Sequence, residues 1–255
     1  MRIFSDKDRP VHMGPYPLER LTRTDDTSFS GLPAFEPVSF RRPEAPESIV
    51  NAMAEYQAML DAIRDGLVNK AVAEFPDCPQ VRADHLKAFG YFNNAAMVGT
   101  GGLPDGARLS APLRNPDIDA LAEALRTRQT KTLAAGIDLI MADLKESMEA
   151  PSTSIDGHSH CLVFAFEFPR DPTEDEPGTD WIGDAQAARA GLLAAETAVV
   201  IANYIRVLGY AARAHTVSTT DVDLNRLAVA TGLASVEDGA LHNPYLGKRL
   251  VLCKV

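Results

Sequence analysis

The stretch AARAGLLAAETAVVIANYIRVLGYAARAHT, residues 187–216, decides the fold of this 255-residue chain. Apolar residues recur in it every three or four positions, which is the spacing of one face of a helix. Gly209 then marks the end of the helix, because glycine takes a left-handed conformation at no steric cost. We expect a long helix over residues 184–208, buried because it is apolar on nearly all sides, and a strand over residues 210–217.

The polar side chains of this helix indicate the environment in which it lies. Arg189, Glu196, Asn203 and Arg206 argue against a membrane span. Glu196 and Asn203 lie seven residues apart and therefore share one stripe of the helix. Because polar groups in a buried helix need partners, we interpret this pair as part of a structural network. The alternative is that the pair forms the polar edge of a cofactor pocket.

The remaining segments complete an α+β fold, in which a mixed sheet packs around the buried central helix. The apolar run HSHCLVFAFEF, residues 158–168, predicts a central strand that is buried on both faces. The other expected elements are an amphipathic helix over 46–73 that begins near Glu47 or Ser48, a short helix over 81–89, a strand and glycine turn over 94–104, a helix over 115–136 that starts at Asn115 or Asp117 and ends at Gly136, a strand over 137–144, a short helix after Asp221 or Asp223, and a terminal strand over 247–255.

The composition of the chain excludes several classes of protein. Apolar residues make up 45% of the sequence and charged residues 24%, which is enough for a substantial core. The net charge of -10 argues against a nucleic-acid partner, because the nucleic-acid backbone attracts a basic surface. The first residues, MRIFSDKDRPVHMG, contain no apolar run of the kind found in a secretory signal. We therefore expect a soluble cytoplasmic protein with no membrane partner.

The sequence offers few metal ligands at useful spacing. Its three cysteines, Cys78, Cys161 and Cys253, lie far apart, so we expect neither a disulfide framework nor an iron–sulfur cluster, which needs a run of closely spaced cysteines. In the segment GHSHC, His158 and His160 share one face of a strand, but two ligands do not complete a tetrahedral site. We predict no metal site.

The glycine-rich segment GTGG, residues 99–102, is a candidate for phosphate binding. No GK[ST] sequence follows it, and no GxGxxG pattern opens a long helix. We therefore interpret it as a turn.

Prolines are frequent in residues 1–46, where they occur in RPVHMGPYPLER and FRRPEAPES. Their spacing excludes long helices. We therefore divide the chain into an extended N-terminal arm, residues 1–46, which lies over a partner surface, and one domain, residues 47–255. The alternative for the arm is a loosely ordered tail.

The second half of the chain contains, in this order, LAAGIDLIMADL, HCLVFAFEF, AARAGLLAAETAVVIANYIRVLGYAARAHT, LNRLAVATGLA and HNPYLGKRLVL. From Leu133 to Leu252 these segments resemble the cobalamin-binding core of reductive dehalogenases, which epoxyqueuosine reductases share. The resemblance implies a nitroreductase-like fold. The earlier segments RPVHMGPYPLERL and HLKAFGYFNNAAMVG resemble the leading half of the long soluble reductive dehalogenases, in which a degenerate copy of the cofactor domain precedes the catalytic copy.

The sequence departs from this family at the positions that carry its chemistry. TGLA, residues 231–234, stands where the family has AGLG. The family's proton donor is a tyrosine beside a basic residue, but residues 169–185 contain no tyrosine or lysine and residues 215–225 contain no lysine. We therefore predict no catalytic residue. The family's two iron–sulfur motifs follow the core, and this sequence reaches Val255 without them.

The resemblance places four side chains where the family's corrinoid lies. They are His215, Thr219, Thr220 and Asn225, whose hydroxyl and amide groups are suited to corrin amides or a nucleotide tail. We predict that they line a vestigial cofactor pocket. We expect no bound cofactor, with cobalamin as the alternative.

Three functions remain open from the sequence. The first is a degenerate cobalamin-binding-type domain of a reductive dehalogenase, which is not catalytic alone and serves as a scaffold and interaction module. The second is a corrinoid-dependent oxidoreductase component that receives electrons from an iron–sulfur partner. The third is a flavin-dependent nitroreductase-like oxidoreductase. We favour the first.

The partner expected for such a domain is the catalytic half of a reductive dehalogenase, or a second copy of the chain in a homodimer. The last strand, residues 250–255, is apolar and has no helix after it to cover it, and an open edge strand invites pairing. We therefore expect contact through the arm and the sheet side rather than through the acidic loop, residues 171–180.

Overall fold

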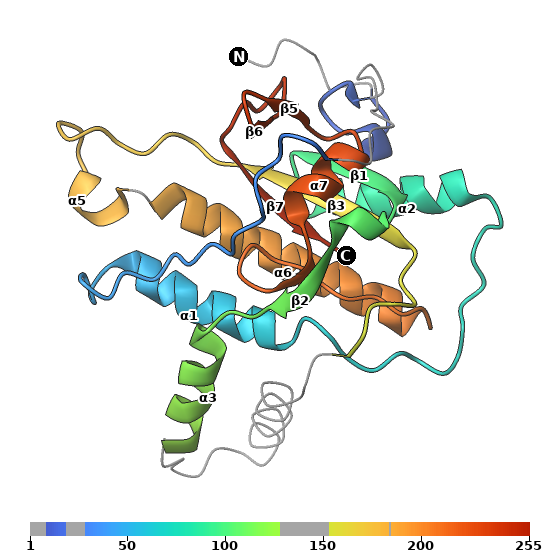
Figure 1. Cartoon of the computed structure of the whole chain (residues 1–255), viewed down its shortest axis with the longest axis horizontal. Coiled ribbons are helices and arrows are strands. Elements are labelled where there is room, and N and C mark those ends of the chain that lie inside the picture. The colour runs from blue at the N-terminus through green and yellow to red at the C-terminus, as the bar shows by residue number, and fades with distance from the viewer. Residues whose placement is uncertain (1–8, 19–28, 128–152, 184) are drawn as a thin grey trace.

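The computed structural model describes residues 9–18, 29–127, 153–183 and 185–255 (Figure 1). In these residues helices and antiparallel sheets form a mixed α+β fold, which confirms the predicted fold class. The elements are, in chain order, η1 (Val11–Met13), α1 (Ile49–Ala62), α2 (Pro79–Phe92), β1 (Met97–Gly102), η3 (Asp105–Ala107), β2 (Arg108–Leu113), α3 (Asp117–Thr127), β3 (His160–Glu167), α5 (Thr179–Ile182), α6 (Ala185–Val207), β4 (Thr220–Val222), α7 (Leu224–Ala230), β5 (Ser235–Glu237), β6 (Ala240–His242) and β7 (Leu250–Lys254).

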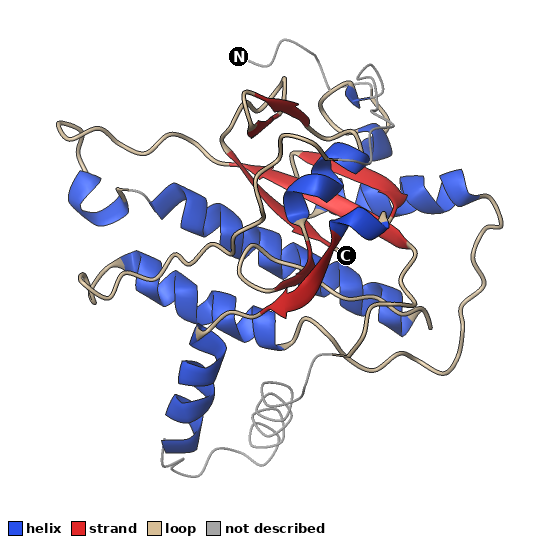
Figure 2. Cartoon of the chain, viewed as in Figure 1, coloured by secondary structure: helices blue, strands red, loops and turns tan. Residues whose placement is uncertain are grey.

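The central sheet has the strand order β1-β3-β7, and both pairings are antiparallel (Figure 2). β3 is the middle strand, and its residues from Cys161 to Phe166 are all buried, as the continuous apolar run predicts. The terminal strand is also confirmed, because β7 pairs with β3 and places Cys253 opposite Phe164. Two smaller sheets, β2-β4 and β5-β6, flank this core.

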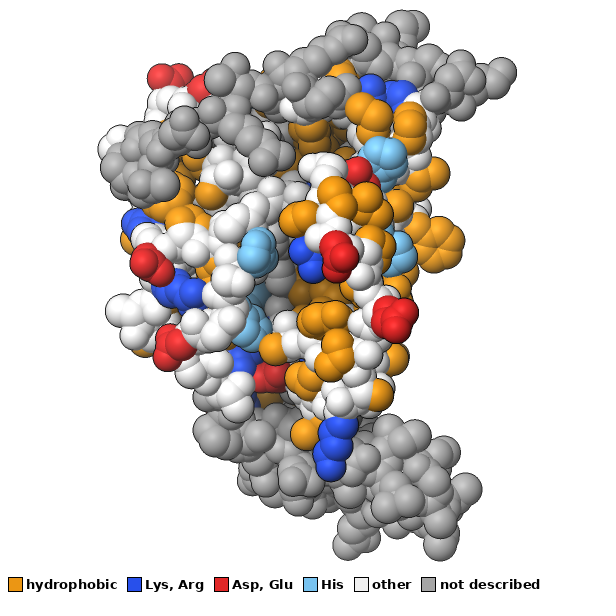
Figure 3. Space-filling view, turned by 90° about the vertical axis from the view of Figure 1, so that its right-hand side faces the viewer, with side chains coloured by type: hydrophobic (Ala, Val, Ile, Leu, Met, Phe, Trp, Pro, Cys, Tyr) orange, Lys and Arg blue, Asp and Glu red, His pale blue; other side chains and the backbone are white. Residues whose placement is uncertain are grey.

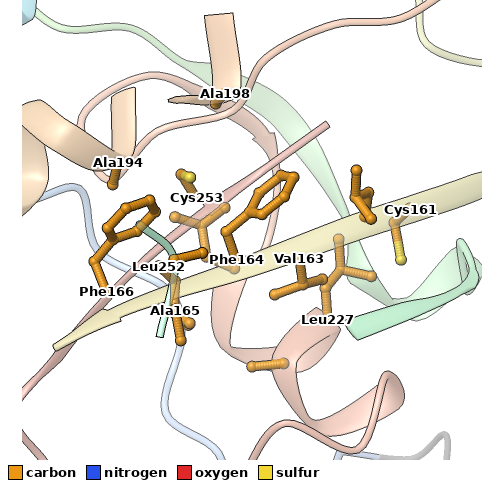
Figure 4. Packing of buried hydrophobic residues seen from close by; sticks show 14 of the residues in the cluster. Cys161, Val163, Phe164, Ala165, Phe166, Ala194, Ala198, Leu227, Leu252 and Cys253 are labelled. Carbon is orange, nitrogen blue, oxygen red and sulfur yellow. The ribbon is translucent and has the colours of Figure 1, made fainter. Parts of the chain in front are cut away.

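Helix α6 packs across one face of the central sheet, which confirms the predicted buried helix. Its inward side consists largely of alanine, so the helix backbone approaches the sheet closely. Figure 4 shows Ala194 and Ala198 above the rings of Phe166 and Phe164, while Val163 lies on the opposite face of the strand. α6 is long and apolar enough to span a membrane, but more than half of its apolar window is buried inside the protein, as in a core helix.

The interpretation of Glu196 and Asn203 as a buried network is wrong. Both side chains are exposed, on the side of α6 that faces away from the sheet. The helix is therefore covered on most of its surface but keeps one open stripe.

The predicted helix over 46–73 is shorter than its apolar spacing indicates. Ser48 caps its start by accepting a hydrogen bond from the Val50 amide, as expected, but α1 ends at Ala62. Beyond it, Arg64 turns inward to an ion pair with Asp221. The amides of Asn69 and Ala73 then bond to the carbonyl groups at the end of α6. Tertiary contacts thus override the helical pattern.

Residues 67–72 expose three large apolar side chains as a result. The exposed fraction is 98% for Leu67, 42% for Val68 and 62% for Val72. The end view of the molecule in Figure 3 shows many hydrophobic side chains gathered on the face to which this segment belongs.

The predicted strand over 210–217 is also wrong. The amides of Ala214, His215 and Thr216 donate to the carbonyl groups of Arg64, Lys254 and Thr219 respectively. Because these three acceptors belong to three different segments, no continuous ladder forms, and only His215 makes a β-bridge, to Lys254 at the outer edge of β7.

The glycines of residues 99–102 belong to strand β1 rather than to a turn. Gly99 pairs with Val163, and a Cβ atom at Gly99 would lie 2.8 Å from the Thr231 Oγ1 atom and 2.9 Å from Leu233. Glycine is required here because α7 and the loop after it pack directly onto the strand. The predicted helix end at Gly136 and the predicted strand over 137–144 lie outside the described residues.

We expect the substitution Ile201→Asp to abolish folding. Ile201 is fully buried on α6, and an unpaired buried carboxylate costs several kcal/mol of a total stability of about 5–15 kcal/mol. The measurement is thermal unfolding followed by circular dichroism. The matched control is Val81→Asp, at an exposed position in the first turn of α2, which should leave the melting temperature nearly unchanged. A cooperative melt of the Ile201 variant at the wild-type temperature would contradict the predicted core.

Candidate functional site

Next to the residues predicted to form a site lies a buried polar network centred on Asp61 of α1. The Asp61 carboxylate accepts four side-chain hydrogen bonds, from Gln57 at 2.9 Å, Asn115 at 2.9 Å, Thr216 at 2.7 Å and Ser218 at 2.6 Å. Burial raises the pKa of Asp61, while the four hydrogen bonds act in the opposite direction. The network ties α1 to the residues before α3 and to the segment after α6.

A second cluster of charges lies next to it. The Asp221 carboxylate accepts from Arg64 at 2.6 Å and from Arg213 at 3.3 Å, and Arg213 also bonds to Asp65 at 2.6 Å. Burial by itself would raise the pKa of Asp221, but the hydrogen bond and the charge of Arg64 outweigh it and lower the pKa. The two arginine side chains are thus neutralised within the fold.

Three of the four residues predicted to line a cofactor pocket are buried in this region. The Nδ1 atom of His215 accepts from the Asp221 amide at 3.2 Å. The hydroxyl of Thr219 accepts from the Asn115 amide at 3.0 Å, and the hydroxyl of Thr220 donates to the Val222 carbonyl at 2.7 Å. These side chains therefore form hydrogen bonds within the fold.

Asn225, the fourth predicted residue, lines a cavity of about 330 Å³ at the start of α7. The cavity lies between residues 35–40, the start of α7 and strand β7. The Val38 amide donates to the Val217 carbonyl at 2.9 Å, so the segment predicted as an arm crosses the surface beside this cavity. The lining residues are Phe35, Glu36, Val38, Phe40, Phe168, Ala187, Val217, Leu224, Asn225, Leu241, Lys248, Leu250, Val251 and Leu252.

No protein-family model matches the sequence, and no curated protein matches it. Solved structures, in contrast, do match this chain. The catabolic reductive dehalogenase NpRdhA, N-terminally tagged, is 32% identical over 100% of this chain, with a TM-score of 0.68. NpRdhA in complex with 3-bromo-4-hydroxybenzoic acid gives 32% identity and a TM-score of 0.69.

The chain has a reductive dehalogenase-like fold. A further match at 32% identity and a TM-score of 0.68 is described as a reductive dehalogenase structure that suggests a mechanism for B12-dependent dehalogenation. The chain spans 30% of the length of each of these reductive dehalogenases. The family resemblance read from the sequence is therefore confirmed for the whole chain.

The residues of this reductive dehalogenase-like fold do not fit a corrinoid at the predicted pocket. Pockets of about 300–1,000 Å³ hold drug-sized ligands, and a corrinoid is several times larger than such a ligand. The cavity beside Asn225 has about 330 Å³, and His215, Thr219 and Thr220 are hydrogen-bonded within the fold. The cavity thus lacks the space for a corrinoid, and three of the four predicted side chains are engaged in other hydrogen bonds.

The histidines of the GHSHC segment do not form a metal centre in the structure. His160 is exposed and its Nδ1 atom lies 2.8 Å from the Ser159 hydroxyl. Among the described residues no group of three or more histidine, cysteine, aspartate or glutamate side chains is arranged to hold a metal ion.

The sequence analysis missed Lys254, a fully buried lysine at the end of β7. Its ammonium group donates to the Leu224 carbonyl at the start of α7, and burial lowers its pKa well below the usual value. The signal in the sequence was a lone charge inside the apolar segment LVLCKV. The missed carboxylate of Asp61 has no comparable signal, because its partners are up to 157 residues away.

We expect Asp61→Ala to destabilise the protein by about 3–5 kcal/mol, because it leaves four buried donors without an acceptor. Urea unfolding measures the loss. The control is Asp156→Ala, an exposed carboxylate on the loop before β3, which should change stability by less than about 0.5 kcal/mol. Equal effects of the two variants would contradict the proposed role of the network.

Stability should also fall in mild acid because of His215. Burial lowers the pKa of His215 from 6.5 to about 3, and the charge of Arg64 acts in the same direction. Below pH 6.5 the unfolded chain therefore binds a proton at this residue that the folded chain does not bind, so stability rises with pH over this window. Between pH 6.5 and 5 the loss of unfolding free energy is about 1.6 kcal/mol.

The measurement is urea unfolding at both pH values, for the wild type and for His215→Asn. The amide oxygen of asparagine keeps an acceptor near the Asp221 amide but does not titrate. The variant should lose less stability on acidification than the wild type does, by about 1.6 kcal/mol. Identical pH dependence would show that His215 is protonated in the folded state.

Proposed function

We propose that this chain is a non-catalytic, cofactor-free domain of the reductive dehalogenase type, which serves as a scaffold for a catalytic partner. The proposal rests on the hydrogen bonds that the predicted pocket residues make within the fold. His215, Thr219 and Thr220 bond within the fold, and residues 35–40 lie beside the remaining cavity. A domain that had kept its cofactor would leave such groups free to bind it.

The chemistry of the described residues also favours a non-catalytic role. The buried charges of Arg64, Arg213 and Asp221 are paired with one another within the fold. Cys161 and Cys253 are buried, and burial raises the pKa of both thiols, so neither is poised as a thiolate ligand or nucleophile. Redox chemistry at a corrinoid requires low-potential electrons. We propose that the iron–sulfur clusters that supply these electrons belong to the partner.

The partner we propose is the cofactor-bearing, catalytic portion of a reductive dehalogenase, in the cytoplasm. The support for it is the share of the relatives that this chain accounts for, which is 30% of the length of each matched reductive dehalogenase. Most of each matched relative thus lies outside the segment to which this fold corresponds.

The test is cofactor binding by the full chain. The protein is incubated anaerobically with hydroxocobalamin and separately with flavin mononucleotide, and the protein fraction from gel filtration is examined by visible absorption. We expect no co-eluting chromophore. We also expect that, with a strong chemical reductant and added cobalamin, bromide release from a bromophenol does not exceed that of free cobalamin.

Each contrary result identifies another function. Stoichiometric corrinoid in the protein fraction, with bromide release above free cobalamin, would replace the proposal with a corrinoid-dependent oxidoreductase component. Stoichiometric flavin would replace it with a flavin-dependent oxidoreductase. Heat-denatured chain provides the baseline for nonspecific adsorption. The variant Asn225→Ala tests whether any retained chromophore is held in the cavity at the start of α7.

A further inference from the structure

A second cavity, of about 450 Å³, lies between residues 12–18, helix α2, strand β1 and the residues after α7. We call it the α2 cavity, because polar side chains of this helix line it, among them Gln80, Asp84 and Lys87. Its volume lies within the range of small-molecule pockets, about 300–1,000 Å³. None of the four residues predicted to line a cofactor pocket contributes to it.

Hydrogen bonds of the N-terminal segment 9–18 hold one wall of the α2 cavity in place. The Nε atom of Arg9 donates to the Gly14 carbonyl at 2.9 Å, and the Tyr245 hydroxyl donates to the Pro17 carbonyl at 3.3 Å. Within this segment, η1 packs against α2. The cavity is therefore already formed in the fold, so a ligand does not have to organise it.

The cavity is lined by opposite charges whose hydrogen-bonding capacity is only partly used. The Oδ1 atom of Asp84 accepts from Gln80 at 2.8 Å. The Nζ atom of Lys87 lies 3.7 Å from the same oxygen, and the Nε2 atom of His12 lies 4.0 Å from Oδ2, and both separations exceed a hydrogen bond. Among the residues that the structure describes, no hydrogen bond reaches the Lys87 ammonium or the Asp84 Oδ2 atom, although these side chains are only 19% and 28% exposed.

Apolar side chains also line the α2 cavity, namely Met13, Leu18 and Val98. A ligand that covers both kinds of surface has an apolar body and carries a positive and a negative group close together. Enclosing either protein charge without a partner costs free energy, so each of the two requires a counterpart on the ligand.

We propose that the α2 cavity binds an α-amino acid with an apolar side chain. The ligand's ammonium group donates to Asp84, its carboxylate accepts from Lys87 and His12, and its side chain lies against the apolar lining. In an α-amino acid the nitrogen and the carboxyl carbon are bonded to one carbon and lie about 2.5 Å apart. They therefore require an acceptor and a donor side by side, as Asp84 and Lys87 are.

The charges of the cavity favour a zwitterion over other ligands. A simple anion would be repelled by Asp84, and a simple cation would be repelled by Lys87. A sugar or other polyol bonds to both groups through its hydroxyls but leaves the apolar lining without a counterpart. The inference does not rest on the proposed scaffold function, because the α2 cavity shares no lining residue with the predicted cofactor pocket.

The experiment is isothermal titration calorimetry of the full chain with L-leucine, L-methionine and L-phenylalanine. We expect at least one of them to bind at one site per chain. For an amino acid that binds, the analogue without the amino group and the analogue without the carboxyl group should each bind about tenfold more weakly or worse, because each leaves one protein charge unsatisfied. Glucose, as the polyol probe, should not bind.

Two variants assign the binding to this cavity. Lys87→Met keeps the aliphatic stem but removes the ammonium, and Asp84→Asn keeps the acceptor for Gln80 but removes the charge. Each should weaken binding of the amino acid about tenfold or more. The matched controls Lys70→Met and Asp77→Asn make the same changes at exposed positions outside the cavity and should leave the affinity unchanged.

Circular dichroism verifies that every variant is folded. Three results would each overturn the inference: no binding of any of the three amino acids, analogues that bind as tightly as the amino acid, or Lys87 and Asp84 variants that bind like their controls. Binding of glucose in place of the amino acids would assign the α2 cavity to polyols instead.

Discussion

The close packing of α6 on strand β3 is the constraint on which the rest of the structure depends. The rings of Phe164 and Phe166 occupy the space above the sheet, so the helix that covers them needs small side chains, and alanine fills the facing positions. The segment after α6 lies against α1, where the hydroxyls of Thr216 and Ser218 bond to Asp61 in the buried polar network.

The buried network gives the polar residues of this region a structural role. Polar side chains in a domain interior destabilise it unless they are paired, and here each carboxylate has found donors from another element. Asp61 links helix α1 to Thr216 and Ser218, and Asp221 anchors Arg64 and Arg213. The polar residues of the segment after α6 have thereby acquired a role in stability, which is sufficient to account for their presence.

Part of the fold could be predicted from local pattern alone. The central strand β3, the helix α6 and the cap of α7 by Asp223 follow from apolar runs, helical spacing and capping chemistry within a few residues. The hairpin β5-β6 could also have been found, because Asp238 and Gly239 form a turn with φ angles of 51° and 73°, as the Asp-Gly signal indicates.

Other features could not be predicted locally, because distant partners decide them. The apolar spacing continues past Ala62 to Leu67, yet Arg64 leaves the helix for Asp221, which is 157 residues away. The sequence analysis assigns His215, Thr219 and Thr220 to a vestigial cofactor pocket, but sequence cannot show whether such groups point at a ligand or at their own backbone. The family resemblance supplied the fold, and only the hydrogen bonds show how these side chains are engaged.

The burial of Lys254 has a consequence for how the opening of this fold can be observed. Its amine is fully buried against the start of α7, and burial lowers its pKa well below the usual value. An acylating reagent reaches this amine only when β7 separates from α7. Acylation at Lys254, followed by peptide mass, therefore reports the frequency of opening of the central sheet, independently of fraying at the surface.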